Sequence, residues 1–256
     1  MADGRAAALM QSGGKAIGIF ISTEGIVSTE AVARAGYDFL LIDTQHGAAN
    51  PASLIGQIQA ASLGGASPWV RIPWNDPAAA MRALDSGAEA VICPMIETVE
   101  DVERFVGACR YPTAGYRSFG PFRAMMVDGG PREGFEARCN EGMLAIAMIE
   151  TLKALENVEA IARVPHLSGL YIGPSDLGAV LGTGAHAIPA DPKVYQAFDR
   201  VVAAAKAAGI PAGVHCGDAA MARVMLDRGF GFVTVATDLV LLSQAARAAL
   251  DAVKQG

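Results

Sequence analysis

Short, nearly continuous apolar segments alternate with alanine-rich segments from one end of the chain to the other. Apolar runs without alternating exposed positions are typical of strands that are buried on both faces of a parallel sheet. The pattern predicts eight such strands. Their expected ranges are residues 16–21, 39–42, 69–72, 90–93, 144–149, 169–172, 212–214 and 232–235.

Helices are expected between these strands. Several alanine-rich segments begin with proline, threonine or aspartate, which suit the first position or the N-cap of a helix. At three helix ends a glycine (Gly36, Gly87 or Gly229) leads within a few residues into an apolar strand, as glycine allows the left-handed conformation that often ends a helix. The clearest helices are residues 51–63, 77–86, 98–108, 152–162, 192–208 and 218–228.

Eight strands with intervening helices predict an α/β fold, the (β/α)8 or TIM barrel, with residues 1–256 as a single domain. A doubly wound open sheet is the alternative, but it does not need eight repeats. The G-x-G-x-x-G of its dinucleotide-binding form is also missing from the first helix. One interval, residues 110–142, breaks the repeat and is rich in Gly, Pro and Arg. Because loops longer than about 15 residues are uncommon unless they serve a function, and this one directly precedes the strand that leads to Glu150, we expect a functional role. A surface excursion or an oligomer contact is the alternative.

Composition narrows the choice of partners. A charged fraction of 18%, a net charge of −6 and the lack of any basic cluster argue against a nucleic-acid partner. No apolar run approaches the roughly 20 residues of a membrane-spanning helix, and the first residues lack a secretion signal, so we expect a cytoplasmic protein with no membrane partner. An apolar content of 52% indicates subunit contacts and hence a homo-oligomer. The four scattered cysteines are expected to be reduced thiols.

Two acidic residues follow consecutive expected strands, at the end where barrel enzymes carry their active sites. These are Glu150 and Asp176, and neighbouring parallel strands lie about 4.8 Å apart. Carboxylates this close share a proton or bind a divalent cation, and an all-oxygen site favours Mg²⁺ or Mn²⁺. The alternative for Asp176 is that it caps the following helix.

A general base and a guanidinium follow other strands. Asp43 precedes His46 by three residues on one loop, so we expect the carboxylate to orient the imidazole as a general base. Arg71 ends an apolar strand, where a guanidinium needs an anion. Its partner is either Glu150 or Asp176, or, if a metal satisfies those acids, a substrate carboxylate or enolate oxygen.

The segment Gly173-Pro174-Ser175 begins a helix, and backbone N–H groups at such a start suit a small carboxylate. Metal, arginine and helix start together predict a site for a 2-oxo acid. His215 ends another apolar strand and is either a further site residue or a satisfied histidine at the rim. No lysine closes an apolar strand, so imine catalysis is not expected.

These motifs closely resemble those of the HpcH/HpaI (hydroxyketoacid aldolase) family of metal-dependent class II pyruvate aldolases. The resemblance extends over about residues 8–249. It is carried by the segments LIDTQHG at residues 41–47, WVR at 69–71, AIAMIET at 145–151 and YIGPSDL at 171–177.

The resemblance implies a (β/α)8 barrel whose C-terminal helix is exchanged between subunits of a homohexamer. It implies Glu150 and Asp176 as ligands of Mg²⁺, Mn²⁺ or Co²⁺, His46 oriented by Asp43 as the base, and Arg71 as the group that stabilises the enolate. Gly173, Pro174 and Ser175 would contact the 2-oxo acid.

Further matches extend the implied site. Asp85 matches an acidic residue that the family places near a neighbouring subunit's site. The segment YRSFG at residues 116–120 resembles a family loop, which implies Phe119 as a substrate-binding residue, with residues 121–123 shaping the aldehyde pocket. Gln45 and Met148 stand where many members carry Glu and Gln, respectively.

The implied activity is reversible aldol cleavage or addition, in which a 4-hydroxy-2-oxo acid gives pyruvate, or hydroxypyruvate, and an aldehyde. An acyl-CoA lyase or thioesterase like the citrate-lyase β-type relatives is the alternative, although the few lysines disfavour a nucleotide groove. A barrel that binds ligand without catalysis is a third possibility.

Overall fold

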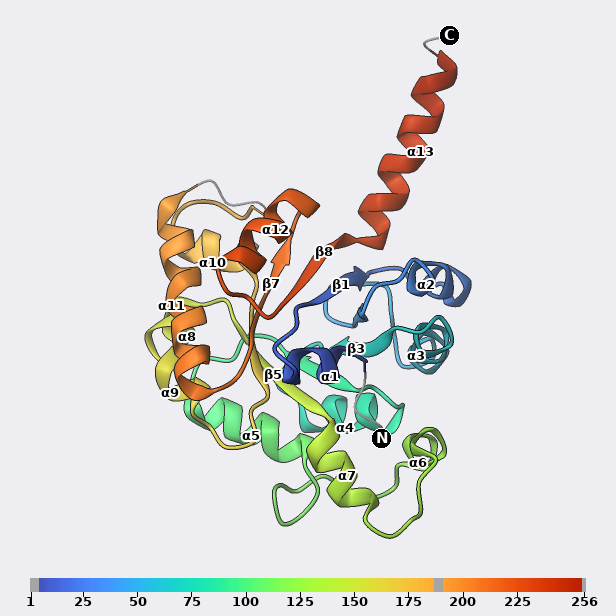
Figure 1. The fold of residues 1–256 in the computed structure, drawn as a ribbon, viewed down its shortest axis with the longest axis vertical. Coiled ribbons are helices and arrows are strands. Elements are labelled where there is room, and N and C mark those ends of the chain that lie inside the picture. Colours follow the sequence, from blue (N-terminus) through green and yellow to red (C-terminus); the bar gives the residue numbers. More distant parts are fainter. Residues whose placement is uncertain (1–4, 187–190, 255–256) are drawn as a thin grey trace.

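The computed structural model describes residues 5–186 and 191–254. Eight parallel strands close into a barrel in chain order, with β8 paired to β1 (Figure 1). The predicted (β/α)8 barrel is therefore confirmed. The strands are β1 (Ala16–Ile21), β2 (Phe39–Asp43), β3 (Ser67–Arg71), β4 (Ala90–Cys93), β5 (Leu144–Ile149), β6 (Gly169–Ile172), β7 (Ala212–Cys216) and β8 (Phe232–Thr237).

Helices follow the strands and cover the outside of the barrel (Figure 1). The expected helix at 51–63 begins only at Leu54, after a turn. The expected helix at 152–162 is divided at Asn157, whose side-chain amide donates to the Glu97 carbonyl oxygen. The helices are α1 (Arg5–Gln11), α2 (Ile26–Ala33), α3 (Leu54–Leu63), α4 (Pro77–Asp85), α5 (Val99–Cys109), α6 (Phe122–Asp128), α7 (Phe135–Gly142), α8 (Leu152–Glu156), α9 (Val158–Ala162), α10 (Pro174–Val180), α11 (Pro192–Ala208), α12 (Ala219–Asp227) and α13 (Asp238–Lys254).

Aromatic side chains fill the barrel interior. The rings of Phe39 and Trp69 stack with centroids 3.9 Å apart, and those of Tyr171 and Phe232 stack at 5.8 Å. Helix α1 packs against this inner cluster through Ala6 and its neighbours. A second, larger apolar cluster lies between the strands and the outer helices. The packed interior leaves the carboxyl ends of the strands as the place for a pocket.

The interval at residues 110–142 is not a plain loop, since it contains α6 and α7. It lies between the end of α5 and the start of β5, and in a barrel this is the end at which strands begin. Figure 1 shows α6 and α7 at the end of the molecule opposite to α13, which leaves from the carboxyl end of β8. The interval therefore lies away from the strand ends of its own chain that carry the acids, because α5 has returned the chain to the opposite rim.

Helix α13 projects from the barrel (Figure 1). Its first residue, Asp238, anchors it: the carboxylate accepts the backbone N–H groups of Ser22 and Thr23 at 2.7 and 3.2 Å and the Thr23 hydroxyl at 2.6 Å. Beyond Asp238 the helix is largely exposed and carries several exposed apolar side chains: Leu239, Val240, Leu241, Leu242, Leu250 and Val253. Within the part of the chain described here, no helix combines the length and apolar character needed to span a bilayer.

Candidate active site

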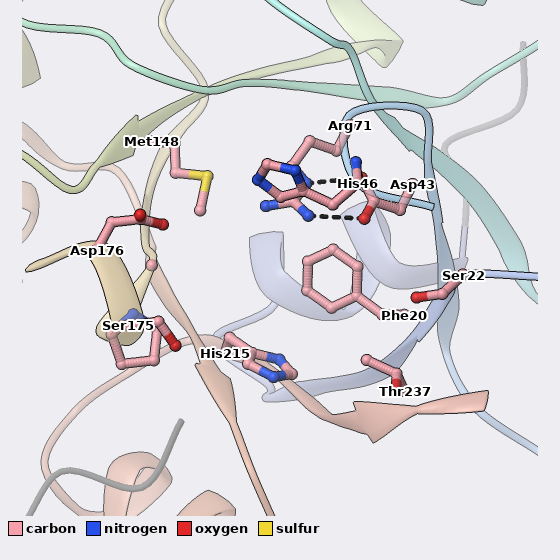
Figure 2. A pocket seen from close by; sticks show the side chains of 12 residues that line it. Phe20, Ser22, Asp43, His46, Arg71, Met148, Ser175, Asp176, His215 and Thr237 are labelled. Carbon is pink, nitrogen blue, oxygen red and sulfur yellow. Dashed lines mark hydrogen bonds and ion pairs between the residues drawn. The ribbon is translucent and has the colours of Figure 1, made fainter. Parts of the chain in front are cut away.

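A pocket of about 250 Å³ opens at the carboxyl ends of the strands. Figure 2 shows Asp176, Met148 and Ser175 on one side, and Phe20, Ser22 and Thr237 on the other. The sequence-predicted residues in its lining are Asp43, His46, Arg71, Gly173, Pro174, Ser175 and Asp176, joined by Phe20, Ser22, Met148, His215 and Thr237.

Asp43 and Arg71 form a buried bidentate ion pair. Arg71 Nε donates to Asp43 Oδ1 at 2.9 Å and Nη2 donates to Oδ2 at 2.7 Å, while the two side chains are only 3% and 9% exposed. The residues are register partners on β2 and β3. The guanidinium carbon also lies 4.8 Å from the centroid of the Phe20 ring. This pair fixes the guanidinium at the pocket and leaves its remaining N–H groups for an anionic ligand.

The structure corrects the role expected of Asp43. Its carboxylate faces Arg71, and Oδ1 also accepts the backbone N–H groups of Gln45 and His46 at 3.1 and 3.4 Å. Asp43 therefore shapes the loop that carries His46, and in the described residues it makes no hydrogen bond to the imidazole itself. This loop is tight, since a Cβ at Gly47 would lie 2.4 Å from the Asp43 carbonyl oxygen.

Glu150 lies at the end of β5 and is 2% exposed. Its Oε1 accepts the backbone N–H of Met95 at 2.7 Å. Burial raises the pKa of Glu150 to about 7; the Met95 N–H opposes the rise, the Asp176 carboxylate adds to it, and Arg71 opposes it. Asp176 is exposed and lines the pocket, whereas Glu150 lies behind the lining residue Gly173. The fold thus brings together the two acids that the sequence singles out.

Gly173 packs closely against Glu150. A Cβ at this position would lie 2.7 Å from Glu150 Oε2 and 2.6 Å from Met148 Cε. The end of the methionine can move, but the carboxylate is held by Met95. The glycine therefore keeps the space that Glu150 occupies.

We expect Gly173→Ala to lower turnover on the order of 10- to 100-fold, because it pushes the Glu150 carboxylate from its place. The backbone at Gly173 is extended, so the added methyl group is not strained by its own φ, and the melting temperature should fall little. Steady-state kinetics with a titration of Mg²⁺ or Mn²⁺ checks this. Unchanged activity and metal requirement would contradict it.

His215, which the sequence leaves open, lines the pocket from β7. Its Nδ1 lies 3.0 Å from Thr234 Oγ1, and its ring meets Phe20 edge-on with centroids 5.1 Å apart. Burial lowers the pKa of His215 to about 4; the nearby Arg71 lowers it further, and Asp43 opposes the change. The imidazole is therefore neutral near pH 7.

This lowered pKa predicts a pH-dependent stability. Between pH 6.5 and 4 the unfolded chain binds a proton at His215 that the folded chain does not, so folding becomes less favourable as the pH falls through this range. Relative to His215→Leu, we expect the native protein to lose about 2–3 kcal/mol more stability over this interval. Urea unfolding of both proteins at several pH values measures it. Parallel pH profiles would contradict the assignment.

Two expected residues lie outside the pocket of their own chain. Phe119 packs with Tyr111 and Phe135, with centroids 5.4 and 6.1 Å away, and Arg132 lies over its ring at 4.0 Å. The expected contact of Phe119 with substrate is thus not formed within one chain. Asp85 ends α4 and accepts from Arg117 Nη2 at 2.7 Å.

Sequence reasoning missed three lining residues. Phe20 and Ser22 lie at the end of β1, and Thr237 ends β8. The available signal was their position at the ends of apolar strands. Phe20 looks like a core residue in a sequence, and small hydroxyl residues are common at strand ends, so this signal is weak. Met148, two residues before Glu150 on β5, is singled out in the sequence only by the family resemblance, and it also lines the pocket.

Comparison with known proteins identifies the family. The chain matches the HpcH/HpaI aldolase/citrate lyase family over residues 16–245. It is 39% identical over 235 residues to a hydroxypyruvate/pyruvate aldolase of Rhizorhabdus wittichii, covering 92% of each chain. It is 33% identical to a 4-hydroxy-2-oxo-heptane-1,7-dioate aldolase of Salmonella heidelberg, over 93% of this chain and 90% of the relative.

A solved structure agrees with these relatives. The crystal structure of a family protein from Burkholderia cenocepacia J2315 superposes with a TM-score of 0.86 at 33% identity, covering 94% of this chain and 95% of that chain. Both the sequence match and the barrel extend over nearly the whole chain. The resemblance seen in the motifs is thereby confirmed, and the chain belongs to the HpcH/HpaI aldolase/citrate lyase family.

Proposed function

We propose that the protein is a metal-dependent class II aldolase that interconverts 4-hydroxy-2-oxo acids with an aldehyde and pyruvate or hydroxypyruvate. The observation that carries this proposal is a pocket lined by Asp176 and by the buried, fixed guanidinium of Arg71, with the Glu150 carboxylate directly behind its lining residue Gly173 and acted on by both charges. The relatives named as aldolases support this activity rather than an acyl-CoA reaction.

The two acids fit a hard divalent cation. Glu150 is buried beside a second carboxylate and its pKa is raised to about 7, so Arg71 and the Met95 N–H compensate its ionised form only in part. Glu150 and Asp176 supply two carboxylates, and among the described residues no larger group of His, Cys, Asp and Glu is suited to a metal. Mg²⁺ commonly binds through one or two carboxylates and keeps water or substrate oxygens in its other positions.

We propose that Glu150 and Asp176 hold Mg²⁺, Mn²⁺ or Co²⁺. The bound ion would supply a Lewis acid for the carboxylate and keto oxygens of the 2-oxo acid. Arg71 directs its remaining N–H groups at the same oxygens and stabilises the enolate charge, and such a fixed donor is typically worth a few kcal/mol. The start of α10 at Pro174 and Ser175 contacts the substrate carboxylate.

His46 is the proposed base. In the cleavage direction it takes the proton of the C4 hydroxyl group as the carbon–carbon bond breaks. In the addition direction it returns that proton to the aldehyde oxygen. Asp43 acts on it through the loop backbone and acts on Arg71 directly. The buried Asp43 carboxylate thus positions both the loop that carries His46 and the Arg71 guanidinium.

Exchange of the pyruvate methyl protons in D₂O, followed by NMR without aldehyde, tests enolate formation. We expect exchange with Mg²⁺, Mn²⁺ or Co²⁺ and none with a chelator. Cleavage of 4-hydroxy-2-oxo acids, followed as pyruvate release, tests the carbon–carbon bond cleavage. Exchange that continues in chelator would overturn the metal requirement, and turnover of acyl-CoA esters without exchange would favour the alternative reaction.

We also propose a homo-oligomer, a hexamer by family resemblance, in which α13 packs on a second copy and Asp85 lies near the partner subunit's pocket. The exposed apolar side chains of α13 support this. Replacing Leu242 and Leu250 with Asp is expected to reduce the assembly to smaller species in light scattering coupled to size-exclusion chromatography. An unchanged mass would contradict the proposed exchange of α13.

A further inference from the structure

A chain of hydrogen bonds connects the barrel interior to the pocket. The Tyr171 hydroxyl lies 2.6 Å from Thr234 Oγ1, and Thr234 Oγ1 lies 3.0 Å from His215 Nδ1. Tyr171 and Thr234 are fully buried, on β6 and β8. His215 is the register partner of Thr234 and is the member of the chain that reaches the pocket.

The number of available protons determines which group donates in each of these two hydrogen bonds. Across residues 5–186 and 191–254, the hydrogen bonds of the Tyr171 hydroxyl are limited to Thr234. If Thr234 donated to Tyr171, the phenolic proton would be buried without an acceptor, at a cost of about 1–3 kcal/mol. Tyr171 therefore donates to Thr234. In the described residues the buried Thr234 hydroxyl has only Tyr171 and His215 as partners, so its own proton goes to His215 Nδ1.

An imidazole that accepts at Nδ1 and is neutral carries its proton on Nε2. The edge-on contact with Phe20 holds the ring in place, with an interplanar angle of 87°. The lowered pKa of His215, about 4, agrees with a neutral ring. His215 thus presents a fixed, uncharged N–H donor at the pocket.

Two hydroxyl side chains share the wall with this donor. Ser22 and Thr237 line the pocket on the side away from Asp176 and Met148, beside the Phe20 ring (Figure 2). In the proposed function Glu150, Asp176 and the start of α10 serve the 2-oxo acid, so this part of the wall is left for the aldehyde. A hydroxyl oxygen is a good acceptor for a neutral N–H, whereas an alkyl group would leave the donor unpaired.

We propose that His215 is a specificity-determining residue, whose Nε2–H donates to a hydroxyl group on the carbon next to the aldehyde carbonyl. The enzyme then prefers hydroxyaldehydes to alkyl aldehydes of the same size. This inference rests on the proposed aldolase activity.

The test compares glycolaldehyde with propanal, which has a methyl group in place of the hydroxyl group, in the addition of pyruvate. We expect the ratio of kcat/KM for glycolaldehyde to that for propanal to fall at least about tenfold in His215→Leu. His215→Gln keeps an N–H donor near the position of Nε2 and should restore most of the ratio. Thr234→Val, which removes the hydroxyl group that fixes the tautomer, should give an intermediate ratio.

Cys216→Ala is the matched control, because Cys216 is the next residue on β7 and packs in the cluster between strands and helices. Its ratio should equal that of the native protein. A ratio unchanged in His215→Leu, or equally lowered in Cys216→Ala, would overturn the inference. Pyruvate methyl exchange by the native protein is measured alongside without aldehyde, so that its absence would mark failure of the proposed function itself.

Discussion

Glu150→Gln is expected to lower metal-dependent turnover on the order of 10³-fold or more. The substitution keeps the size of the side chain but removes the charge that, with Asp176, would hold the cation. The Gln carbonyl oxygen can still accept the Met95 N–H, and a neutral amide does not pay the desolvation cost that raises the pKa of the buried acid. The melting temperature should therefore stay the same or rise.

The measurement combines kcat at saturating Mg²⁺ or Mn²⁺ with thermal unfolding. Asp176→Asn should act in the same direction, and Glu141→Gln, at an exposed position on α7, is the control of equal charge change. A Glu150→Gln protein that is fully active in chelator would exclude a metal at these acids.

Arg71→Ala is expected to affect both turnover and stability. Turnover should fall on the order of 10²- to 10³-fold, since the fixed donor to the enolate is lost. Stability should fall by about 3–5 kcal/mol, because the Asp43 carboxylate remains buried without its positive partner. From the sequence alone we expect Arg71→Ala to reduce turnover far more than stability, and the buried ion pair changes that expectation.

Two further variants separate the contribution of Arg71 to stability from its contribution to turnover. In Asp43→Ala/Arg71→Ala the loss of stability should be smaller than the sum of the two single losses, because no unpaired charge remains. Arg71→Lys keeps the charge but loses the two-pronged geometry, so it should recover more stability than turnover. Urea unfolding and kcat are the readouts. Additive losses in the double variant would show that the pair contributes no coupling.

The sequence predicts the barrel and several residues of the candidate site, but it does not predict which of their side chains pair with one another. Continuous apolar strands and glycine-terminated helices locate all eight strands, and strand-end polarity finds Arg71, Glu150 and Asp176. The partner of Arg71 depends on the register of β2 against β3, which places it opposite Asp43. Register is a tertiary property, and local spacing suggested His46 as the partner of Asp43 instead.

The position of Phe119 was equally hidden. A motif indicates what a loop resembles, whereas the end of the barrel at which the loop lies depends on whether it follows a strand or a helix. Because α5 returns the chain to the end where strands begin, Phe119 lies there with Tyr111 and Phe135. Only a neighbouring subunit could bring that loop to a pocket.

Closure of the barrel by β8, which Asp238 follows directly, has a consequence for synthesis in the cell. The bond from Ser22 to Asp238 spans 216 residues, so at 5–20 residues per second the ribosome needs roughly 10 to 40 s to make both partners available. During that interval β1 has an open edge, which is the form most prone to pair with the wrong chain. Nascent chains should therefore depend on chaperones until β8 emerges, and slower translation should increase their aggregation.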